Sequence, residues 1–386
     1  MYMTKAPDDS VTHYDPTLSF GGYTLFAAHG GTDAWLIDME GRICHRWRLK
    51  SRPGSGMTLL PNGNLLVLSK TGKEPTTFLG TGGGELHEID WDGNVVWRHE
   101  DEYMHHDFKR LASGNTLLNR HVLIPEETAS TVRGGIPGTE HESGMWGNAY
   151  REITPDGKTA WEWLGYEHMD PVVDVPCALC PRSIWGYVNG IDTTTEGDVV
   201  GSFRHLNNLV IADRTSGAIK WRWGTWELGH QHNPTILDSG NILVLDNGYH
   251  RLPPHNLRTT VSAEGYSRVL EVNPRTDNIE WSYEAEPPTG FWSHICSSAQ
   301  RMPNGNTVIC ESGSGRIFEV TKEGKIVWQF ISSFYEKMGR YGLTNLVYKA
   351  KRYGADDPAL VRKDLSPHKY DWTLHRTTDG IAERVG

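Results

Sequence analysis

The hydrophobic and polar positions of this chain repeat as pairs of short alternating strands that are joined by tight turns. Six segments share one pattern, in which an apolar strand leads into a small polar turn and the return strand ends in tryptophan. These segments span residues 36–47, 88–97, 151–163, 210–223, 270–281 and 318–328. Alternating apolar, β-branched and aromatic residues on both sides of such a turn predict six β-hairpins.

A second kind of hairpin is interleaved with the first. Its copies are LLPNGNLLVLS from Leu59, RLASGNTLLN from Arg110, ILDSGNILVL from Ile236, RMPNGNTVIC from Arg301 and a degenerate TTTEGDVVGS from Thr193. One hairpin of each kind in a period of about 50 to 60 residues is typical of a propeller blade. We therefore predict an all-β chain that forms a six-bladed β-propeller with four-stranded antiparallel blades. The segment NLVYKAKRY, Asn345 to Tyr353, is expected to supply the strand that closes the ring.

We expect one propeller domain over residues 1–386, with the blades at about 20–353 and a C-terminal extension at 354–386. Propeller blades are modules of a single domain, so the chain length does not require a second one. Three polar insertions rich in proline or glycine interrupt the repeat at about 119–148, 164–186 and 249–266. Loops of this length in a compact fold are usually functional, and we expect them to form a lid or rim over one face.

Composition and charge exclude several classes of partner. The net charge of -10 and the lack of a long basic run argue against nucleic acid. No long apolar run and no secretory layout at the N-terminus are present, so we expect no membrane contact and a cytoplasmic location for the chain as it stands. Homo-oligomerisation is left open, and a small aromatic molecule is the expected partner.

The five cysteines fit reduced thiols better than a disulfide framework. Cys177 and Cys180 in PCALCP could form half of a zinc site or a redox pair, but no second CxxC motif completes a site. A turn that carries two thiols is the favoured interpretation. We expect neither a cofactor nor a metal.

Alignment of the inner hairpins on their turns brings polar residues to one equivalent position. That position holds Ser55, His106, Asn189, His232 and Ser297, and in a propeller it begins the innermost strand, facing the central channel. Further histidines lie close to it in sequence, namely His105, His205, His230 and His294. Convergence of histidines from several blades predicts an active site. Asn189, Asn247 and Glu311, together with these further histidines, are candidates for substrate binding.

Four motifs, in this order along the chain, resemble the bacterial arylsulfate sulfotransferase family. They are WGYVNGID, GDVVGSFRHLNNLVIADRTSGAIKWRWG, GHQHNPTILDSGNILVLDNGYHR and SSAQRMPNGNTVIC. The likeness covers about Trp97 to Trp328. It implies a six-bladed propeller that moves a sulfuryl group between phenols through a sulfohistidine, without a nucleotide donor. By the same resemblance His232 would be the nucleophile, Arg204 would hold the sulfuryl oxygens, and His106, or the adjacent His105, would be the third functional group.

The chemistry of the reaction favours the same set of residues. Sulfuryl transfer spreads negative charge over the equatorial oxygens and onto the leaving phenolate. Arg204 supplies a fixed cation, His232 a nitrogen nucleophile and His106 a proton donor near neutral pH.

Tyr187 departs from the family pattern, because a histidine of an H-x-N-S-I string stands there in the family. A phenol beside arginine and histidines also suits proton abstraction. The alternative function is therefore a lyase or hydrolase that acts on a small aromatic or carboxylated substrate. Its acid/base and anion-binding groups would be Tyr187, His106, His232 and Arg204. A metal-dependent enzyme that uses His106, His232 and one of His205, His230 or His294 is a further one. A pure interaction scaffold would not require this inward set of His, Arg and Tyr.

Overall fold

The computed structural model describes residues 10–80, 82–251, 265–338 and 342–367, together with the strands β28 (His375–Arg376) and β29 (Ala382–Glu383). The third predicted insertion, at 249–266, lies largely outside these residues, as does much of the predicted C-terminal extension. The described chain is nearly all β-structure, and its one α-helix is α1 (Glu126–Thr131). In the described ranges no helix is both long and apolar enough to cross a membrane.

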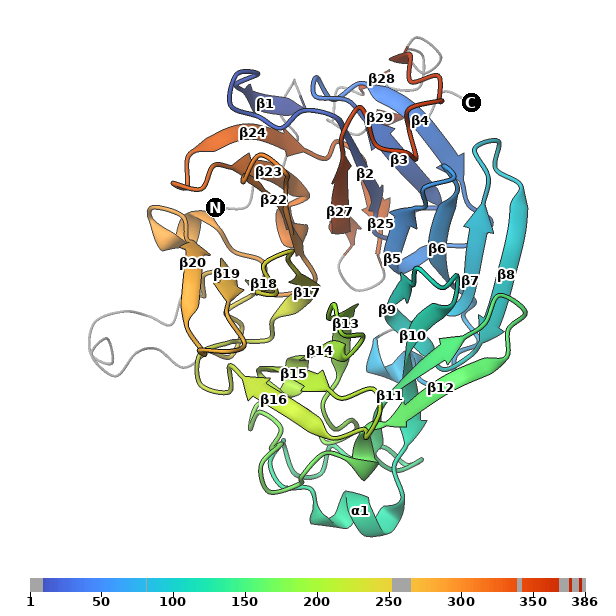
Figure 1. Cartoon of the computed structure of the whole chain (residues 1–386), viewed down its shortest axis with the longest axis vertical. Coiled ribbons are helices and arrows are strands. Elements are labelled where there is room, and N and C mark those ends of the chain that lie inside the picture. Colours follow the sequence, from blue (N-terminus) through green and yellow to red (C-terminus); the bar gives the residue numbers. More distant parts are fainter. Residues whose placement is uncertain are drawn as a thin grey trace. The chain divides into compact units, whose positions relative to one another are not determined.

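Six antiparallel blades of four strands account for the main strands, and they confirm the predicted six-bladed β-propeller (Figure 1). The first three blades consist of β27 (Val347–Tyr353), β2 (Tyr23–Ala28), β3 (Asp33–Ile37) and β4 (Ile43–Arg48); β5 (Pro53–Leu59), β6 (Leu65–Lys70), β7 (Gly84–Ile89) and β8 (Val95–Asp101); and β9 (Met104–Arg110), β10 (Thr116–Leu123), β11 (Trp146–Ile153) and β12 (Thr159–Leu164). The other three consist of β13 (Val188–Thr193), β14 (Val199–Phe203), β15 (Asn208–Ala212) and β16 (Ile219–Trp223); β17 (His232–Ile236), β18 (Ile242–Asp246), β19 (Arg268–Val272) and β20 (Ile279–Tyr283); and β21 (Ser298–Arg301), β22 (Thr307–Glu311), β23 (Arg316–Val320) and β24 (Ile326–Ile331).

The first blade takes one strand from the far end of the chain. β27 pairs with β2 from Tyr353 opposite Tyr23 to Val347 opposite Ala28. This is the closing strand that the segment NLVYKAKRY predicts. The N-terminal β1 (Val11–Tyr14), which the repeat does not predict, adds a fifth strand to the last blade beside β24.

The repeated tryptophans join neighbouring blades through their indole N–H groups. Each of four such tryptophans donates to a backbone carbonyl in the outer turn of the following blade, and each bond lies within one compact unit of the chain. The bonds run from Trp47 to Asp90, from Trp163 to Gly217, from Trp223 to Asp277 and from Trp328 to Met39, at 2.8 to 3.1 Å. A buried indole N–H requires such an acceptor. The tryptophan period is therefore a requirement of blade packing.

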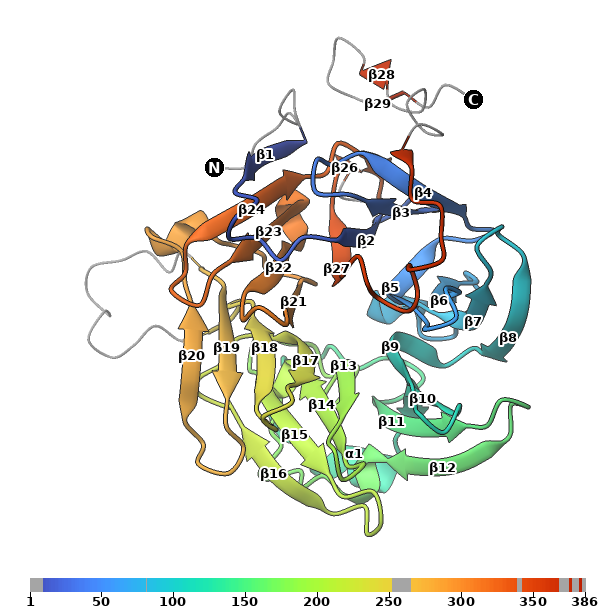
Figure 2. The ribbon, with the colours of Figure 1, turned by 45° about the horizontal axis from the view of Figure 1, so that its top comes forward.

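Contacts between Cα atoms group the chain into two compact units. Unit 1 comprises Met1–Lys70, Leu86–Arg98 and Ile295–Gly386, and unit 2 comprises Thr71–Glu85 and His99–His294. Unit 2 contains the three complete blades from β9 to β20. Within it the inner strand β13 contacts both β9 and β17, and Figures 1 and 2 show these three strands side by side.

Candidate active site

Unit 2 contains every residue that the sequence predicts for the site except Glu311. The residues come from the inner strands and from the turns beside them. His105 and His106 lie on β9, Tyr187 and Asn189 at the start of β13, Arg204 and His205 in the 3-10 turn η3 (Arg204–Leu206), and His230, His232, Asn247 and His294 in or near the following blade. Propeller topology therefore brings together residues from three consecutive blades.

The backbone is strained where the inner strands begin. His106, Tyr187 and His230 each have a φ of 57°, in the left-handed region. A residue other than glycine costs about 1 to 3 kcal/mol in such a conformation, and the surrounding structure must supply this energy. A buried apolar cluster that includes Trp163 and Phe203 extends to Val188, the residue after Tyr187. Strain of this kind is characteristic of functional sites.

Two acceptors define the tautomer of His232. Its Nδ1 lies 2.7 Å from Oδ1 of Asn247 and 3.0 Å from the carbonyl oxygen of His230. The amide nitrogen of Asn247 donates to the carbonyl of Ser293 at 2.7 Å, which orients the amide so that its oxygen faces the imidazole. Because a carbonyl and an amide oxygen only accept, Nδ1 must carry the proton. The Nε2 of His232 makes no hydrogen bond with a described residue and keeps its lone pair.

Burial keeps His232 neutral. It is 4% exposed, and burial, followed by the charge of Arg204, lowers its pKa to about 3. A neutral imidazole with an unprotonated Nε2 is the nucleophilic form of histidine.

Arg204 is the cation of this site. Four histidines nearby have lowered pKa values, for which burial is the largest cause and the charge of Arg204 the second. They are His205, His230, His232 and His294. In the described part of the chain no carboxylate pairs with its guanidinium. A planar cation without an anionic partner, surrounded by neutral imidazoles, is suited to binding an oxyanion.

Local hydrogen bonds position Arg204. Its backbone N–H donates to the carbonyl of Tyr187 at 3.1 Å, and that of His205 donates to the carbonyl of Gly186 at 2.9 Å. Gly186 has a φ of 95°, and a Cβ there would lie 2.8 Å from the side chain of Asn148. Only glycine fits this approach. Asn207, at a φ of 53°, then ends the turn.

Tyr187 connects Arg204 to two histidines. Its ring stacks on that of His205 with centroids 4.7 Å apart, meets the ring of His106 edge-on at 5.2 Å, and lies 5.8 Å from the guanidinium carbon of Arg204. Its hydroxyl donates to the carbonyl of Leu79 at 2.8 Å. The phenol proton is therefore held by a backbone acceptor.

His105 and His106 share a hydrogen bond, with their Nδ1 atoms 2.6 Å apart. Asn119 Nδ2 approaches the Nδ1 of His105 at 3.4 Å, which makes His105 the acceptor and His106 the donor. His105 also stacks on His121 at 3.6 Å. Burial lowers the pKa of His105 to about 3 and holds that of His121 well below its usual value, so both rings stay neutral. Asp107, the residue after this pair, accepts from the backbone N–H of Ile191 at 3.2 Å.

Three other residues that were predicted to bind substrate make different contacts in the structure. Asn189 donates to the carbonyl of Gln231 at 2.8 Å and so holds the strand next to His232. His294 is half-buried and lies 6.0 Å from the ring of Tyr249. Glu311 belongs to unit 1, where it is buried and pairs with Arg316 at 3.0 Å. It therefore has a cationic partner of its own.

A second cluster lies next to the first and includes a residue that the sequence pattern does not single out. The ligand atoms of Cys177, Cys180, His230 and His250 all lie within 4.8 Å of one another. The hydrogen bond with Cys180 lowers the pKa of Cys177, while the same bond and burial raise the pKa of Cys180. In the sequence, this cluster corresponds to a CxxC motif that is completed by two histidines instead of by a second CxxC motif.

The chain belongs to the arylsulfotransferase (ASST) family, whose sequence model matches residues 56–333. No curated protein matches it. Among solved structures, a protein of unknown function from Bacteroides caccae is 14% identical, with 86% of this chain and 98% of that one covered and a TM-score of 0.55. A streptogramin B lyase is 10% identical, with 92% and 96% covered and a TM-score of 0.48. At 14% identity, the likeness to the Bacteroides caccae protein shows the fold alone.

Proposed function

We propose that this protein is an enzyme that transfers a sulfuryl group from an aryl sulfate to a phenol, with His232 as the nucleophile. The observation that carries the proposal is the pair of acceptors on Nδ1 of His232, which leaves Nε2 as the unprotonated nitrogen. Membership of the arylsulfotransferase family supports the class of reaction.

The first half-reaction forms a bond between Nε2 of His232 and sulfur as the bond from sulfur to the aryl oxygen breaks. Arg204 binds the sulfuryl oxygens, whose charge develops in the transition state. The leaving phenolate takes a proton, and the product phenol departs. The sulfuryl group then remains on His232 as a sulfohistidine.

The second half-reaction reverses the first with another phenol. The acceptor gives up its proton as its oxygen bonds to sulfur, and the bond between nitrogen and sulfur breaks. His106 is the proposed carrier of the proton in both steps, because imidazole is a common proton carrier in catalysis and the ring of His106 meets that of Tyr187, which lies next to Arg204. Protons and electron pairs balance over the two steps.

The test is incubation of the purified protein with p-nitrophenyl sulfate, with and without an acceptor phenol. We expect release of nitrophenolate that depends on the acceptor, and intact mass spectrometry without acceptor should show one added sulfuryl group on His232. His232→Asn should abolish both. Nitrophenolate release that survives in this variant would refute the nucleophile assignment, and inert aryl sulfates would favour the lyase or hydrolase alternative.

A further inference from the structure

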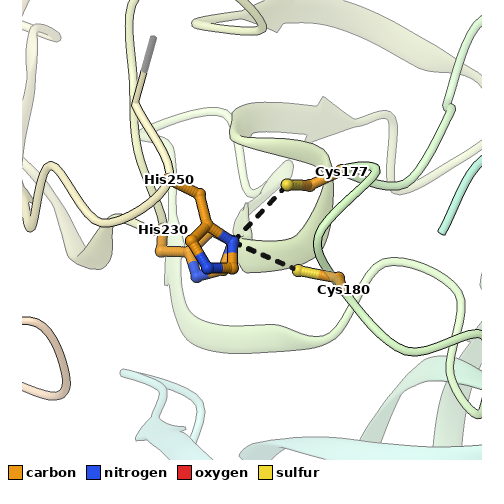
Figure 3. A group of neighbouring side chains, drawn as sticks. All are labelled: Cys177, Cys180, His230 and His250. Carbon is orange, nitrogen blue, oxygen red and sulfur yellow. Dashed lines mark hydrogen bonds between the residues drawn. The ribbon is translucent and has the colours of Figure 1, made fainter. Parts of the chain in front are cut away.

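Four potential metal ligands converge in unit 2 from three separate segments of the chain. Cys177 and Cys180 lie in the insertion before β13, His230 precedes β17, and His250 follows β18. The Sγ of Cys180 lies 3.2 Å from Nε2 of His230, and the Nδ1 of His250 lies 3.6 Å from Sγ of Cys177 and 4.0 Å from Sγ of Cys180. Figure 3 shows both sulfur atoms turned toward the ring of His250.

These separations match the edges of a tetrahedral zinc site. Bonds of about 2.3 Å to sulfur and about 2.0 Å to nitrogen, at the tetrahedral angle, place neighbouring sulfur and nitrogen ligands about 3.6 Å apart. Of the three observed distances, one equals this value, one is shorter and one is longer, each by 0.4 Å. We propose that Cys177, Cys180, His230 and His250 bind one Zn²⁺ ion.

The donor set selects the metal. Two sulfur and two imidazole ligands suit zinc, whereas magnesium and calcium require oxygen ligands. Two thiolates balance the charge of Zn²⁺, so the completed site would be neutral although it is largely buried. Four protein ligands leave no position for water or substrate, which makes the proposed site a structural one.

Backbone hydrogen bonds hold the ligands in place without using their ligand atoms. The N–H of Cys180 donates to the carbonyl of Cys177 at 2.9 Å, which forms the tight turn of a CxxC motif. The N–H of Cys177 donates to the carbonyl of His205 at 2.7 Å, and the N–H of His230 donates to Oδ1 of Asn207 at 3.0 Å. Cys177 and His230 are thus anchored directly to the turn that carries Arg204, and Cys180 is anchored to it through Cys177.

The proposed metal would also orient His232. This second role depends on the proposed function of His232, whereas the metal site itself does not depend on it. His230 is a ligand through its side chain, and its carbonyl accepts the hydrogen bond from Nδ1 of His232. Zinc would therefore fix the acceptor that determines the tautomer of His232.

Metal content of the full chain, purified under reducing conditions, tests the site directly. We expect about one zinc per chain by elemental analysis, and replacement of zinc by Co²⁺ should produce the visible ligand-field and thiolate-to-cobalt charge-transfer bands of a tetrahedral thiolate site. Cys177→Ser and His250→Asn should lose the metal, whereas Cys44→Ala, which removes a buried thiol in unit 1, should keep it. The measurements on the unaltered chain stay decisive even if a variant fails to fold.

Two outcomes would overturn the metal site. A reduced chain that holds no metal after incubation with Zn²⁺ and shows both thiols free would make the cluster a hydrogen-bonded one, and a bond between Cys177 and Cys180 that persists in reductant would make it a disulfide. Neither result requires an activity assay, so neither bears on sulfuryl transfer. Conversely, a folded His250→Asn variant without zinc but with full transfer activity would remove only the orienting role.

Discussion

The Oδ1 of Asn247 accepts a hydrogen bond from the Nδ1 of His232 at 2.7 Å, and both residues lie at the open end of one inner hairpin, away from its turn. The amide of Asn247 is in turn held by the carbonyl of Ser293. This relationship leaves Nε2 of His232, the atom proposed to attack sulfur, as the unprotonated nitrogen of the ring.

Removal of this acceptor should slow catalysis without removing the nucleophile. For Asn247→Ala we expect a fall in kcat of about 10- to 100-fold, since one buried hydrogen bond of about 1 to 3 kcal/mol is lost. Stopped-flow or steady-state assay of nitrophenolate release measures the effect. Asn241→Ala, at the turn of the same hairpin, removes an amide that donates to Glu271 at 2.8 Å; it is the matched control and should have unchanged kcat. An Asn247→Ala enzyme with normal kcat would show that the tautomer needs no help from this amide.

Substitution of Arg204 should separate charge from geometry. We expect Arg204→Gln to lower kcat/KM by about 100-fold or more, because one oxyanion-binding group is typically worth that much. Arg204→Lys should be intermediate, since lysine retains the charge but not the planar fork. Arg133→Gln, which changes an exposed arginine, should have no effect. Equal activity of the lysine and glutamine variants would contradict a role for the cation.

Substitution of His106 should matter most for poor leaving groups. Asparagine is the best replacement, because it tolerates the positive φ of 57° at this position. With His106→Asn we expect a larger loss of kcat/KM for phenyl sulfate than for p-nitrophenyl sulfate, since nitrophenolate leaves readily without a proton. The same loss for both donors would assign His106 to packing or binding instead of proton transfer.

Tyr187 distinguishes transfer from the alternative lyase or hydrolase chemistry. Phenylalanine keeps the stacking on His205 and loses the hydrogen bond to the carbonyl of Leu79. For Tyr187→Phe we expect less than about a tenfold change in sulfuryl transfer, the value of one modest hydrogen bond. If the phenol were a catalytic base, turnover should fall by about 100-fold or more.

Acid should destabilise the protein through its buried neutral histidines. Burial lowers the pKa of His105 to about 3 and holds that of His121 well below its usual value, while an unfolded histidine has a pKa of about 6.5. Below about pH 6.5 these histidines are therefore protonated in the unfolded chain but stay neutral in the folded chain. As a result, the free energy of unfolding falls as the pH falls from about 6.5 toward 3. Each such histidine contributes at most about 1.4 kcal/mol per pH unit.

Urea unfolding between pH 7 and pH 5 measures this slope. His121→Asn can keep the hydrogen bond to Thr76, which is 2.9 Å in the structure, but cannot titrate, and should make the slope shallower. His13→Asn, on the exposed β1, should leave the slope unchanged. A slope that is equally steep in both variants would mean that His121 does not contribute to the acid response.

The fold could be read from local patterns. Hairpins such as Leu36 to Trp47 depend on alternation of side chains and on the turn between the strands, and both are properties of about a dozen adjacent residues. The closing strand at Asn345 to Tyr353 followed from the one blade that the repeat left incomplete. The added strand β1 did not, because its pairing with β24 depends on where the first residues meet an open blade edge.

The sequence by itself determined the blades, their tryptophan spacing and the family motifs that single out Arg204 and His232. Only the tertiary structure decided how the functional atoms meet. The proton position on His232 depends on an amide 15 residues away, and Cys177 meets His250 across 73 residues. The physical reason is that strand periodicity is encoded by neighbouring residues, whereas the contacts of a side chain depend on the direction in which each blade and loop presents it.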